Sequence, residues 1–310
     1  MKYFNEEIYP NEVAIEITNK CNMDCIMCPR KRMRRNIGNI ELSLFEKMLK
    51  EISQFPNKPI LKFNFNGDFL TLPNTEIIKY LEIVRRYCPH NICVLTTNGL
   101  GLSSEKIQSF KKYQINHFHI SIDAFTSETY LKIRQNGHFN KVKDNIEKLI
   151  RLKDDNMKIQ VSLVKQKDNE SEVDEFVKYW SPKVDSVYIG SVCSRGGAIS
   201  LVKEETKNDP CFMLWDRIVI CNDGLVALCC QDWDCQNIIG DTNNDSLKDI
   251  WNGNIIRSIR KSHIKGEMPL ICGNCNPQLW NGDSFPDEWK KYFSEINISE
   301  RIVLAETLFC

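Results

Sequence analysis

"VAIEITNKCNMDCIMC", residues Val13 to Cys28, joins a strand pattern to three closely spaced cysteines. Its first part, Val13–Thr18, is rich in β-branched and apolar side chains and predicts a strand. Its last part, Cys21–Cys28, has the spacing C-x3-C-x2-C. Chemistry in parallel α/β folds collects at the carboxyl ends of strands, so a loop there can aim three thiols at one point. Cysteines that only fill a core have no reason to adopt this spacing, and the stretch therefore predicts a metal-binding loop.

The alternation of strand and helix patterns continues from this stretch to about residue 192. Five further β-rich runs are Ile60–Phe65, Ile92–Thr97, His117–Ile122, Lys158–Val164 and Val184–Gly190. Helical patterns lie between them at Leu44–Gln54, Thr75–Tyr87, Ser104–Tyr113, Val142–Leu152 and Glu172–Trp180. The expected N-caps of the first three helices are Ser43, Asn74 and Ser103. Strands that alternate with helices predict βαβ units and a parallel sheet, either doubly wound or closed into an incomplete barrel.

Composition limits the class of partner. The chain has 310 residues, with 41 basic and 41 acidic side chains and zero formal net charge. This balance argues against a dedicated nucleic-acid or membrane-surface binder. No run approaches the ~18 apolar residues of a membrane span, and the start of the chain lacks the apolar core of a signal peptide. We therefore expect a cytoplasmic protein, in which 14 cysteines are more typical of metal binding than of disulfides.

The number of thiols in the first loop bears on the metal that it would hold. Zinc needs a fourth ligand, and the nearest histidine, His90, is far along the chain. An iron–sulfur cubane takes four thiolates, so three thiols would leave one iron open to a ligand from outside the protein.

The cysteine spacing after a first strand resembles the signature of the radical S-adenosylmethionine (SAM) enzymes. The resemblance implies that Cys21, Cys25 and Cys28 hold a [4Fe–4S] cluster whose open iron is chelated by SAM. It implies reductive cleavage of SAM to a 5′-deoxyadenosyl radical, which abstracts a substrate hydrogen, and an electron donor such as flavodoxin or ferredoxin. The fold of that family is a partial (β/α)6 TIM-like barrel, which agrees with the six predicted strands.

Further positions resemble the SAM-binding residues of that family. The segment Asn66–Asp68 stands where the family has a G-G-E-P-like motif that holds the SAM amino group, here without the proline and with the shorter acid. Arg134 resembles the arginine that grips the SAM carboxylate. The full set that the resemblance assigns to SAM is Asn66, Gly67, Asp68, Asn98, Ser121, Asp123, Arg134 and Val164. Taken singly, each position has an alternative, such as a turn at Asn98, a cap at Ser121 or a solvated helix face at Arg134.

A basic run, "RKRMRR" (Arg30–Arg35), follows the cysteine loop. Such runs are typical of a solvated face. Attraction of an anionic substrate or reductant is the second interpretation.

Residues 211–275 hold seven cysteines. Two β-rich runs joined by the turn Asn222–Gly224 predict a hairpin, and Ser246–Trp251 predicts a helix. A hairpin, a helix and a terminal C-x2-C can close a four-thiolate site, for which spacing alone leaves zinc as an alternative to an iron–sulfur cluster. Adjacent residues of a hairpin face opposite sides, so only one of Cys229 and Cys230 can point at that site.

This region resembles the auxiliary-cluster domains called SPASM and twitch, especially those of the butirosin 2-deoxy-scyllo-inosamine dehydrogenase type. The resemblance favours the shorter twitch form with one auxiliary [4Fe–4S] cluster, which makes two clusters in all. The cysteines that it assigns as ligands are Cys211, Cys229, Cys272 and Cys275. We therefore expect a partial (β/α)6 barrel at residues 1–204, a small β-hairpin/helix domain at 205–285, and a C-terminal helix and tail at 286–310.

Four residues are candidates for catalysis. Arg195 follows the sixth strand, where butirosin-type enzymes have an arginine that contacts the substrate hydroxyl; a domain-linking ion pair is the alternative. Cys193, Cys230 and Cys235 are candidate hydrogen-atom donors. The first functional hypothesis is a dehydrogenase that oxidises a small hydroxylated substrate. The second is an epimerase or peptide maturase, and the third is a non-catalytic iron–sulfur electron carrier, which would have no need of SAM-binding residues.

Overall fold

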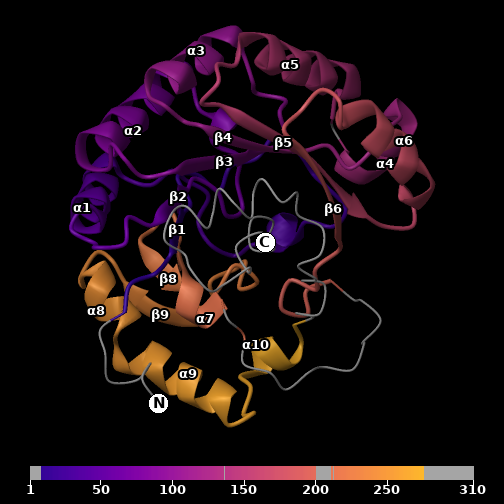
Figure 1. Ribbon diagram of the computed structural model, residues 1–310. Coiled ribbons are helices and arrows are strands. Elements are labelled where there is room, and N and C mark those ends of the chain that lie inside the picture. The colour runs from indigo at the N-terminus through magenta and orange to yellow at the C-terminus, as the bar shows by residue number, and fades with distance from the viewer. Residues whose placement is uncertain (1–7, 136, 200–210, 212, 276–310) are drawn as a thin grey trace.

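A computed structural model describes residues 8–135, 137–199, 211 and 213–275 of the chain (Figure 1). Its first part is an arc of six parallel strands that pair in sequence order. These strands are β1 (Glu12–Ile15), β2 (Ile60–Lys62), β3 (Cys93–Thr97), β4 (His117–Ser121), β5 (Lys158–Lys165) and β6 (Ser186–Ser191). The arc confirms the predicted partial barrel, and all six strand positions agree with the sequence patterns.

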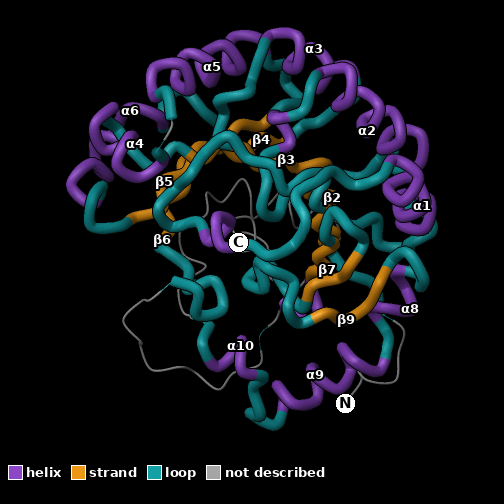
Figure 2. The backbone as a smooth tube through the Cα atoms, turned by 180° about the vertical axis from the view of Figure 1, so that it is seen from behind, coloured by secondary structure: helices purple, strands orange, loops and turns teal. Residues whose placement is uncertain are grey.

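Helices cover the outer face of the arc, as Figures 1 and 2 show from opposite sides. They are α1 (Leu42–Ile52), α2 (Asn74–Tyr87), α3 (Ser104–Lys112), α4 (Ser127–Arg134), α5 (Phe139–Leu152) and α6 (Val173–Trp180). A core of buried aliphatic and aromatic side chains, among them Phe45, Phe110 and Phe118, fills the layer between helices and sheet.

Within the barrel the sequence patterns missed the helix α4, and two of the three predicted caps are wrong. The helix α4 is short and begins at a real cap, because the Thr126 hydroxyl accepts a hydrogen bond from the Thr129 amide. Ser103 caps α3 as predicted. Ser43 is wrong as a cap because it lies inside α1, and Asn74 is wrong because α2 already begins there, after Pro73.

The second cysteine region continues the same sheet. Strands β7 (Arg217–Ile220) and β8 (Leu225–Ala227) form the predicted antiparallel hairpin, and β9 (Ile238–Asp241) pairs with β8. Strand β7 lies parallel to β1, so the sheet runs β6-β5-β4-β3-β2-β1-β7-β8-β9. The two cysteine regions therefore follow neighbouring strands of one sheet.

A buried ion-pair cluster holds β7 against the barrel. The Glu12 carboxylate of β1 pairs with the Lys62 ammonium of β2 at 2.8 Å and with the Arg217 guanidinium of β7. All three side chains are almost fully buried. Burial, followed by the charge of Arg217, lowers the pKa of Lys62 to about 8. Each charge depends on the others for compensation, so loss of one partner would leave a buried charge unbalanced.

Four short or peripheral helices complete the described part of the chain. These are α7 (Met213–Asp216), α8 (Leu247–Trp251), α9 (Asn254–Ile264) and α10 (Leu270–Gly273). The helix predicted from Ser246 is α8, and the Ser246 hydroxyl caps it. The expected boundary at residues 204 and 205 and the expected C-terminal helix and tail lie outside the described residues. Among the residues that are described, no helix has the length and apolar character needed to cross a membrane.

Candidate active site

The first cysteine loop leaves the carboxyl end of β1 and is fixed by backbone contacts. The Cys28 amide donates to the Cys25 carbonyl at 3.0 Å, and the Ile26 amide donates to the Ile133 carbonyl of α4 at 2.9 Å. All three cysteines of the loop are partly buried and free of disulfides. Burial, and then the negative charge of Asp68, raises the pKa of the Cys21 thiol to about 11. A thiolate at this place therefore depends on a bound cation or cluster to balance its charge.

The segment after β2 supports the end of β3. The resemblance assigns Asp68 to the SAM amino group, yet both carboxylate oxygens accept hydrogen bonds from the chain. They accept from the Leu70 amide at 2.9 Å, the Thr97 hydroxyl at 2.9 Å and the Asn98 amide at 2.8 Å. Asp68 thus holds Asn98, whose side-chain amide lies 3.9 Å from the Cys21 sulfur. Asp68 therefore holds the end of β3 beside the cysteine loop, and its contact with the SAM amino group stays a prediction.

Gly67, in the loop after β2, lies against the backbone of the loop after β1. A Cβ atom at this position would lie 2.0 Å from the Thr18 carbonyl oxygen and 2.7 Å from the Asn19 Cα. Neither atom belongs to a flexible side chain, so relief would require the loop after β1 to move away from the loop after β2.

We expect the Gly67→Ala substitution to destabilise the protein strongly. Overpacking against backbone costs about 3 kcal/mol or more, which would lower the thermal unfolding midpoint by roughly 5–10 °C in a chain of this size. The matched control is Gly273→Ala, because a Cβ there meets no atom within 4 Å and the site is helical. Differential scanning calorimetry of both variants makes the comparison. Equal midpoints for Gly67→Ala and the wild type would contradict the close approach.

An ion pair between the segment after β4 and helix α4 lies on another side of the first cysteine loop. Asp123 has a left-handed backbone (φ 62°) and is fully buried. Its Oδ1 accepts from the Val164 amide at 2.7 Å, and its Oδ2 lies 2.6 Å from Arg134 Nη2. Arg134 in turn places Nη1 at 3.4 Å from the Cys25 sulfur. Arg134 thus links Asp123, and through it the Val164 amide, to the Cys25 thiol. Ser121, at the end of β4, accepts a hydrogen bond from the Ser162 hydroxyl of β5 at 3.3 Å.

The residues present fit the cofactors that the resemblance implies. The Nε atom of Arg134 is a buried donor with no hydrogen-bond partner among the described residues, and it lies in the side chain that contacts Cys25. A carboxylate, such as that of SAM, is the acceptor that would satisfy it. No three His, Cys, Asp or Glu side chains of the described residues are placed to hold a single metal ion. A cubane binds each thiolate through a different iron, and with three thiolates it keeps one iron open for a ligand such as SAM.

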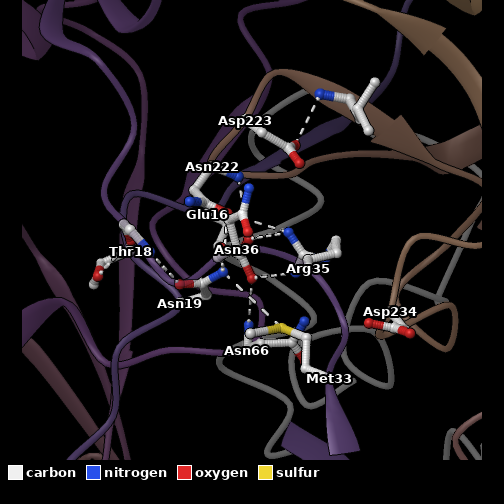
Figure 3. A network of polar contacts seen from close by, with 12 residues as sticks. Glu16, Thr18, Asn19, Met33, Arg35, Asn36, Asn66, Asn222, Asp223 and Asp234 are labelled. Carbon is white, nitrogen blue, oxygen red and sulfur yellow. Dashed lines mark hydrogen bonds and ion pairs between the residues drawn. The ribbon is translucent and has the colours of Figure 1, made fainter.

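A buried polar network joins the first loop to the hairpin, and the sequence patterns missed it. Figure 3 shows Glu16, Arg35 and Asn222 at its centre. The Arg35 guanidinium donates two hydrogen bonds to the Glu16 carboxylate, at 2.7 and 3.0 Å. The backbone amide of Asn222 donates to the same carboxylate at 3.1 Å. Asn66 contributes its backbone amide to Glu16 at 3.2 Å and its side-chain amide to the Trp233 carbonyl.

The basic run is therefore not a uniformly solvated face. The Arg35 side chain is 8% exposed, whereas that of Arg34 is 76% exposed and pairs with Asp234 at 3.1 Å. The interpretation as a solvated run is wrong for Arg35. The signal that could have found it is Glu16 at the end of the first strand, because a buried acid requires a cationic partner.

The second cysteine set gathers near the end of the hairpin. Burial raises the pKa of the Cys211 thiol to about 11 and those of Cys272 and Cys275 to about 12. Burial, and then the neighbouring thiols of Cys230, Cys211 and Cys275, raises the pKa of Cys229. Cys211, Cys229, Cys272 and Cys275 are thus linked as electrostatic neighbours, a group to which Cys230 also belongs, and the ligand set stays a prediction.

The remaining candidate residues lie around this set. Cys230 is buried beside Ala14 and Val219, and its carbonyl accepts a bond from Arg195 Nη1 at 3.5 Å. Cys193 is partly buried and is an electrostatic neighbour of Cys275. Cys235 is buried, with its thiol in hydrogen-bond contact with that of Cys221. The sequence patterns did not anticipate this pair of thiols.

Comparisons with known proteins agree with this arrangement. The family model described as "Radical SAM superfamily" matches residues 15–179, and the SPASM model, described as "Iron-sulfur cluster-binding domain", matches residues 211–276. The S-adenosyl-L-methionine-dependent 2-deoxy-scyllo-inosamine dehydrogenase of Niallia circulans is 20% identical over 269 residues, covering 85% of this chain and 92% of that protein. The GTP 3′,8-cyclase of Clostridium acetobutylicum is 29% identical over 165 residues, covering 53% of this chain and 51% of that protein, so the chain matches about half the length of this relative.

Solved structures show the same fold. The structure of BtrN in complex with AdoMet and 2-DOIA has a TM-score of 0.63 and 19% identity, covering 90% of this chain and 98% of that one. The structure of Streptococcus suis SuiB bound to the precursor peptide SuiA has a TM-score of 0.67 and 12% identity, covering 83% of this chain and 68% of that one. Because the first family model spans more than half of the chain and the partial barrel agrees with it, this protein belongs to the Radical SAM superfamily.

Proposed function

We propose that the protein is a radical SAM dehydrogenase that oxidises a hydroxyl-bearing carbon of a small polar molecule, such as a sugar or an aminocyclitol. The observation that carries this proposal is the extent of one alignment. The inosamine dehydrogenase aligns over 92% of its length, whereas the GTP 3′,8-cyclase of Clostridium acetobutylicum aligns over 51%. A relative that shares the barrel and the second cysteine region is the better guide to the reaction than one that matches over half of its length.

The cofactors of this proposal are SAM and two [4Fe–4S] clusters. Cys21, Cys25 and Cys28 would hold the first cluster, and the second would be held by Cys211, Cys229, Cys272 and Cys275. When bound, SAM and the first cluster supply a 5′-deoxyadenosyl radical that removes a hydrogen atom from the substrate. The donor of the initiating electron would be a small carrier such as flavodoxin or ferredoxin. We place the barrel at residues 1–204, the twitch-type unit at 205–285 and the tail at 286–310.

Oxidation of an alcohol to a ketone removes one hydrogen atom, one proton and one electron. The protein therefore has to stabilise the hydroxyl oxygen from which the proton leaves. Arg195 is the residue that we assign to the hydroxyl. Its guanidinium stays charged at every working pH, so it acts as a hydrogen-bond donor that stabilises the oxygen as the proton leaves, and not as a base. Its contact with the Cys230 carbonyl at 3.5 Å places it beside the second cysteine set.

An isotope experiment tests the reaction. Reconstituted protein is incubated anaerobically with SAM, dithionite and a panel of sugars and aminocyclitols that carry deuterium at the hydroxylated carbons. We expect a product lighter by two hydrogens and the abstracted deuterium in 5′-deoxyadenosine. The same reaction in heavy water should add no deuterium to a carbon of the product.

The second candidate is an epimerase or peptide maturase. It is favoured by the fold shared with SuiB, which was solved bound to a precursor peptide, and by the buried thiol of Cys230 close to the second cysteine set. An epimerase returns a hydrogen atom, so its product keeps its formula and takes up one solvent deuterium. Loss of that deuterium on mutation of Cys193, Cys230 or Cys235 would replace our proposal with this one. Membership of the Radical SAM superfamily counts against the third hypothesis, a non-catalytic carrier.

A further inference from the structure

A pocket of about 510 Å³ lies beside the basic run and the loop that carries Arg195. Four segments line it: the end of the basic run, the loop after β6, the loop after β8, and α10. Its lining includes Arg32, Arg34, Arg195, Gln231, Trp233 and Leu270. The volume is within the range of small-molecule sites, about 300–1,000 Å³.

The pocket is close in sequence to the predicted cluster ligands on three sides. Gln231 directly follows Cys230, and Ile271 and Asn274, which also line the pocket, directly precede Cys272 and Cys275. Arg32 belongs to the turn Pro29–Arg32, which begins directly after Cys28. The pocket is thus lined by residues next to the predicted ligands of both cysteine sets and by none of the predicted SAM-binding residues, so a substrate would place there the end that is remote from SAM.

The charges of the pocket favour an anion. Three arginines line it against two aspartates, and both aspartates are engaged by the chain. Asp234 accepts from the Arg34 amide at 2.8 Å and from Arg34 Nε at 3.1 Å. Asp232 accepts from the backbone amides of Gln236 and Asn237 at 2.9 and 2.8 Å. Both carboxylates are thus bonded to groups of the chain itself and stabilise the loop after β8.

Arg32 is the cation that is most available to a ligand. Its Nη2 donates to the Ala198 carbonyl at 2.6 Å, and its guanidinium carbon lies 6.0 Å from the centre of the Trp233 ring. It makes no ion pair within the part of the chain that the structure describes. A fork of guanidinium donors held over an indole suits a planar or multidentate oxyanion.

The loop that carries Arg195 is held in a defined shape. Arg195, Gly196 and Gly197 are three consecutive residues with positive φ, at 51°, 62° and 89°. A Cβ on Gly196 would meet the Ile271 side chain at 2.7 Å, so the loop packs closely on α10. A non-glycine residue in the left-handed region is uncommon and costs conformational energy, which the packing of this loop offsets. The guanidinium of Arg195 thereby reaches the pocket from the side that faces the second cysteine set.

We propose that Arg32 binds a phosphate group of the substrate in this pocket, which leaves Arg195 for the reacting hydroxyl, so that the substrate is a phosphorylated sugar or cyclitol. The inference rests on the proposed function and narrows its substrate class. It also separates this chain from the Niallia circulans dehydrogenase, whose name specifies an amine and no acidic group.

Equilibrium binding tests the proposal without turnover. Calorimetric titrations use the holoenzyme with SAM and no reductant, and the probes are myo-inositol 1-phosphate, myo-inositol and inorganic phosphate. We expect the phosphorylated probe to bind at least about tenfold more tightly than myo-inositol, because charge-assisted bonds to guanidinium are the strong ones. Raising the salt concentration should weaken only the two phosphate-bearing probes, since pairs near the surface are screened.

Variants separate the roles of the two arginines. Arg32→Gln should weaken binding of myo-inositol 1-phosphate about tenfold or more and leave myo-inositol unchanged, whereas Arg195→Gln, at the residue assigned to the hydroxyl, should weaken both probes. Arg32→Lys, which keeps the charge and loses the fork, should fall between Arg32→Gln and the wild type. The matched control is Lys31→Gln, from the same basic run, because Lys31 pairs with Asp24 at 3.6 Å and is absent from the pocket lining. Unfolding midpoints of all four variants check that they fold.

The outcomes separate the two proposals. Equal affinity for myo-inositol and its phosphate, or a phosphate preference that survives Arg32→Gln, would overturn the pocket assignment and leave the dehydrogenase proposal standing. Intact phosphate selectivity together with no product lighter by two hydrogens would support the pocket and count against the dehydrogenase alone.

Discussion

Replacing Cys21, Cys25 and Cys28 together with alanine is expected to remove about half of the bound iron and to abolish reductive cleavage of SAM. The wild type should carry roughly eight irons per chain and the variant roughly four, if both clusters are cubanes. The physical reason is that the three thiols belong to one loop at the end of β1, while the second set sits on other segments. Loss of the first set therefore leaves the second set intact.

Iron analysis and the yield of 5′-deoxyadenosine measure this prediction in anaerobically reconstituted protein. The matched control is the double variant Cys88→Ala, Cys93→Ala, because both thiols are buried in the barrel core and outside either set. It should lose some stability through the cavities that it creates, yet keep all of its iron. Undiminished 5′-deoxyadenosine from the triple variant would refute the assignment of the first loop.

Much of the barrel can be predicted from the sequence, because its signals are local. Each strand is a β-rich run bounded by turn residues, and each of the five predicted helices shows the apolar spacing of a helix that packs on a sheet. The first cysteine loop is equally local: three ligands within eight residues at a strand end. The hairpin β7–β8 could be predicted from its turn, where Gly224 has a φ of 91°.

The relation between the two cysteine regions could not be predicted in this way. Strand β7 pairs with β1 across about two hundred residues, with Val13 opposite Ile218, and no local pattern specifies such a partner. The charges that secure the pairing, Glu12 with Arg217, are single residues in apolar runs. A buried acid in a strand indicates that a cation lies opposite, but it does not say which one.

The same limit applies to the residues around the first loop. Asp68 stands at the position of a SAM-binding acid, and its actual partners, Thr97 and Asn98, belong to the next strand. Arg35 is one of five basic residues in a run of six, and only the presence of Glu16 beneath it distinguishes it from its solvated neighbours. Sequence spacing predicts which elements meet, whereas the pairing of individual polar groups depends on the loop conformations.

The shared sheet has a consequence for how the two sets work together. Neighbouring strands lie about 4.8 Å apart, so β1 and β7 fix the starting points of the two cysteine regions with the rigidity of a sheet. The Arg35–Glu16 pair and the Asn222 amide then tie the loop after β1 to the turn after β7. We therefore expect the separation between the two proposed clusters to be set by the fold and to change little when a substrate binds.

Replacing Cys211, Cys229, Cys272 and Cys275 with alanine is the second large effect that we expect. The variant should retain roughly four irons, from the first cubane, and should still cleave SAM in part. Substrate oxidation should fail, because the electron that leaves the substrate would lose its acceptor. Zinc in equal amount to protein, with no iron–sulfur absorption in anaerobically purified wild type, would instead support the four-thiolate zinc site.

Single substitutions at the adjacent positions decide which cysteine is the fourth ligand. Cys230 is 2% exposed and packs with Ala14, Val219 and Ala227 in a small apolar cluster under the hairpin, whereas Cys229 is partly exposed. Both are electrostatic neighbours of Cys211 or Cys275, so proximity alone does not separate them. The side chain that packs in the apolar cluster is the less free to turn toward iron, and we therefore expect Cys229→Ala to lose the second cluster and Cys230→Ala to keep it. Iron content and the absorption near 400 nm that is typical of cubanes are measured for the two variants side by side. The reverse result would identify Cys230 as the ligand in place of Cys229.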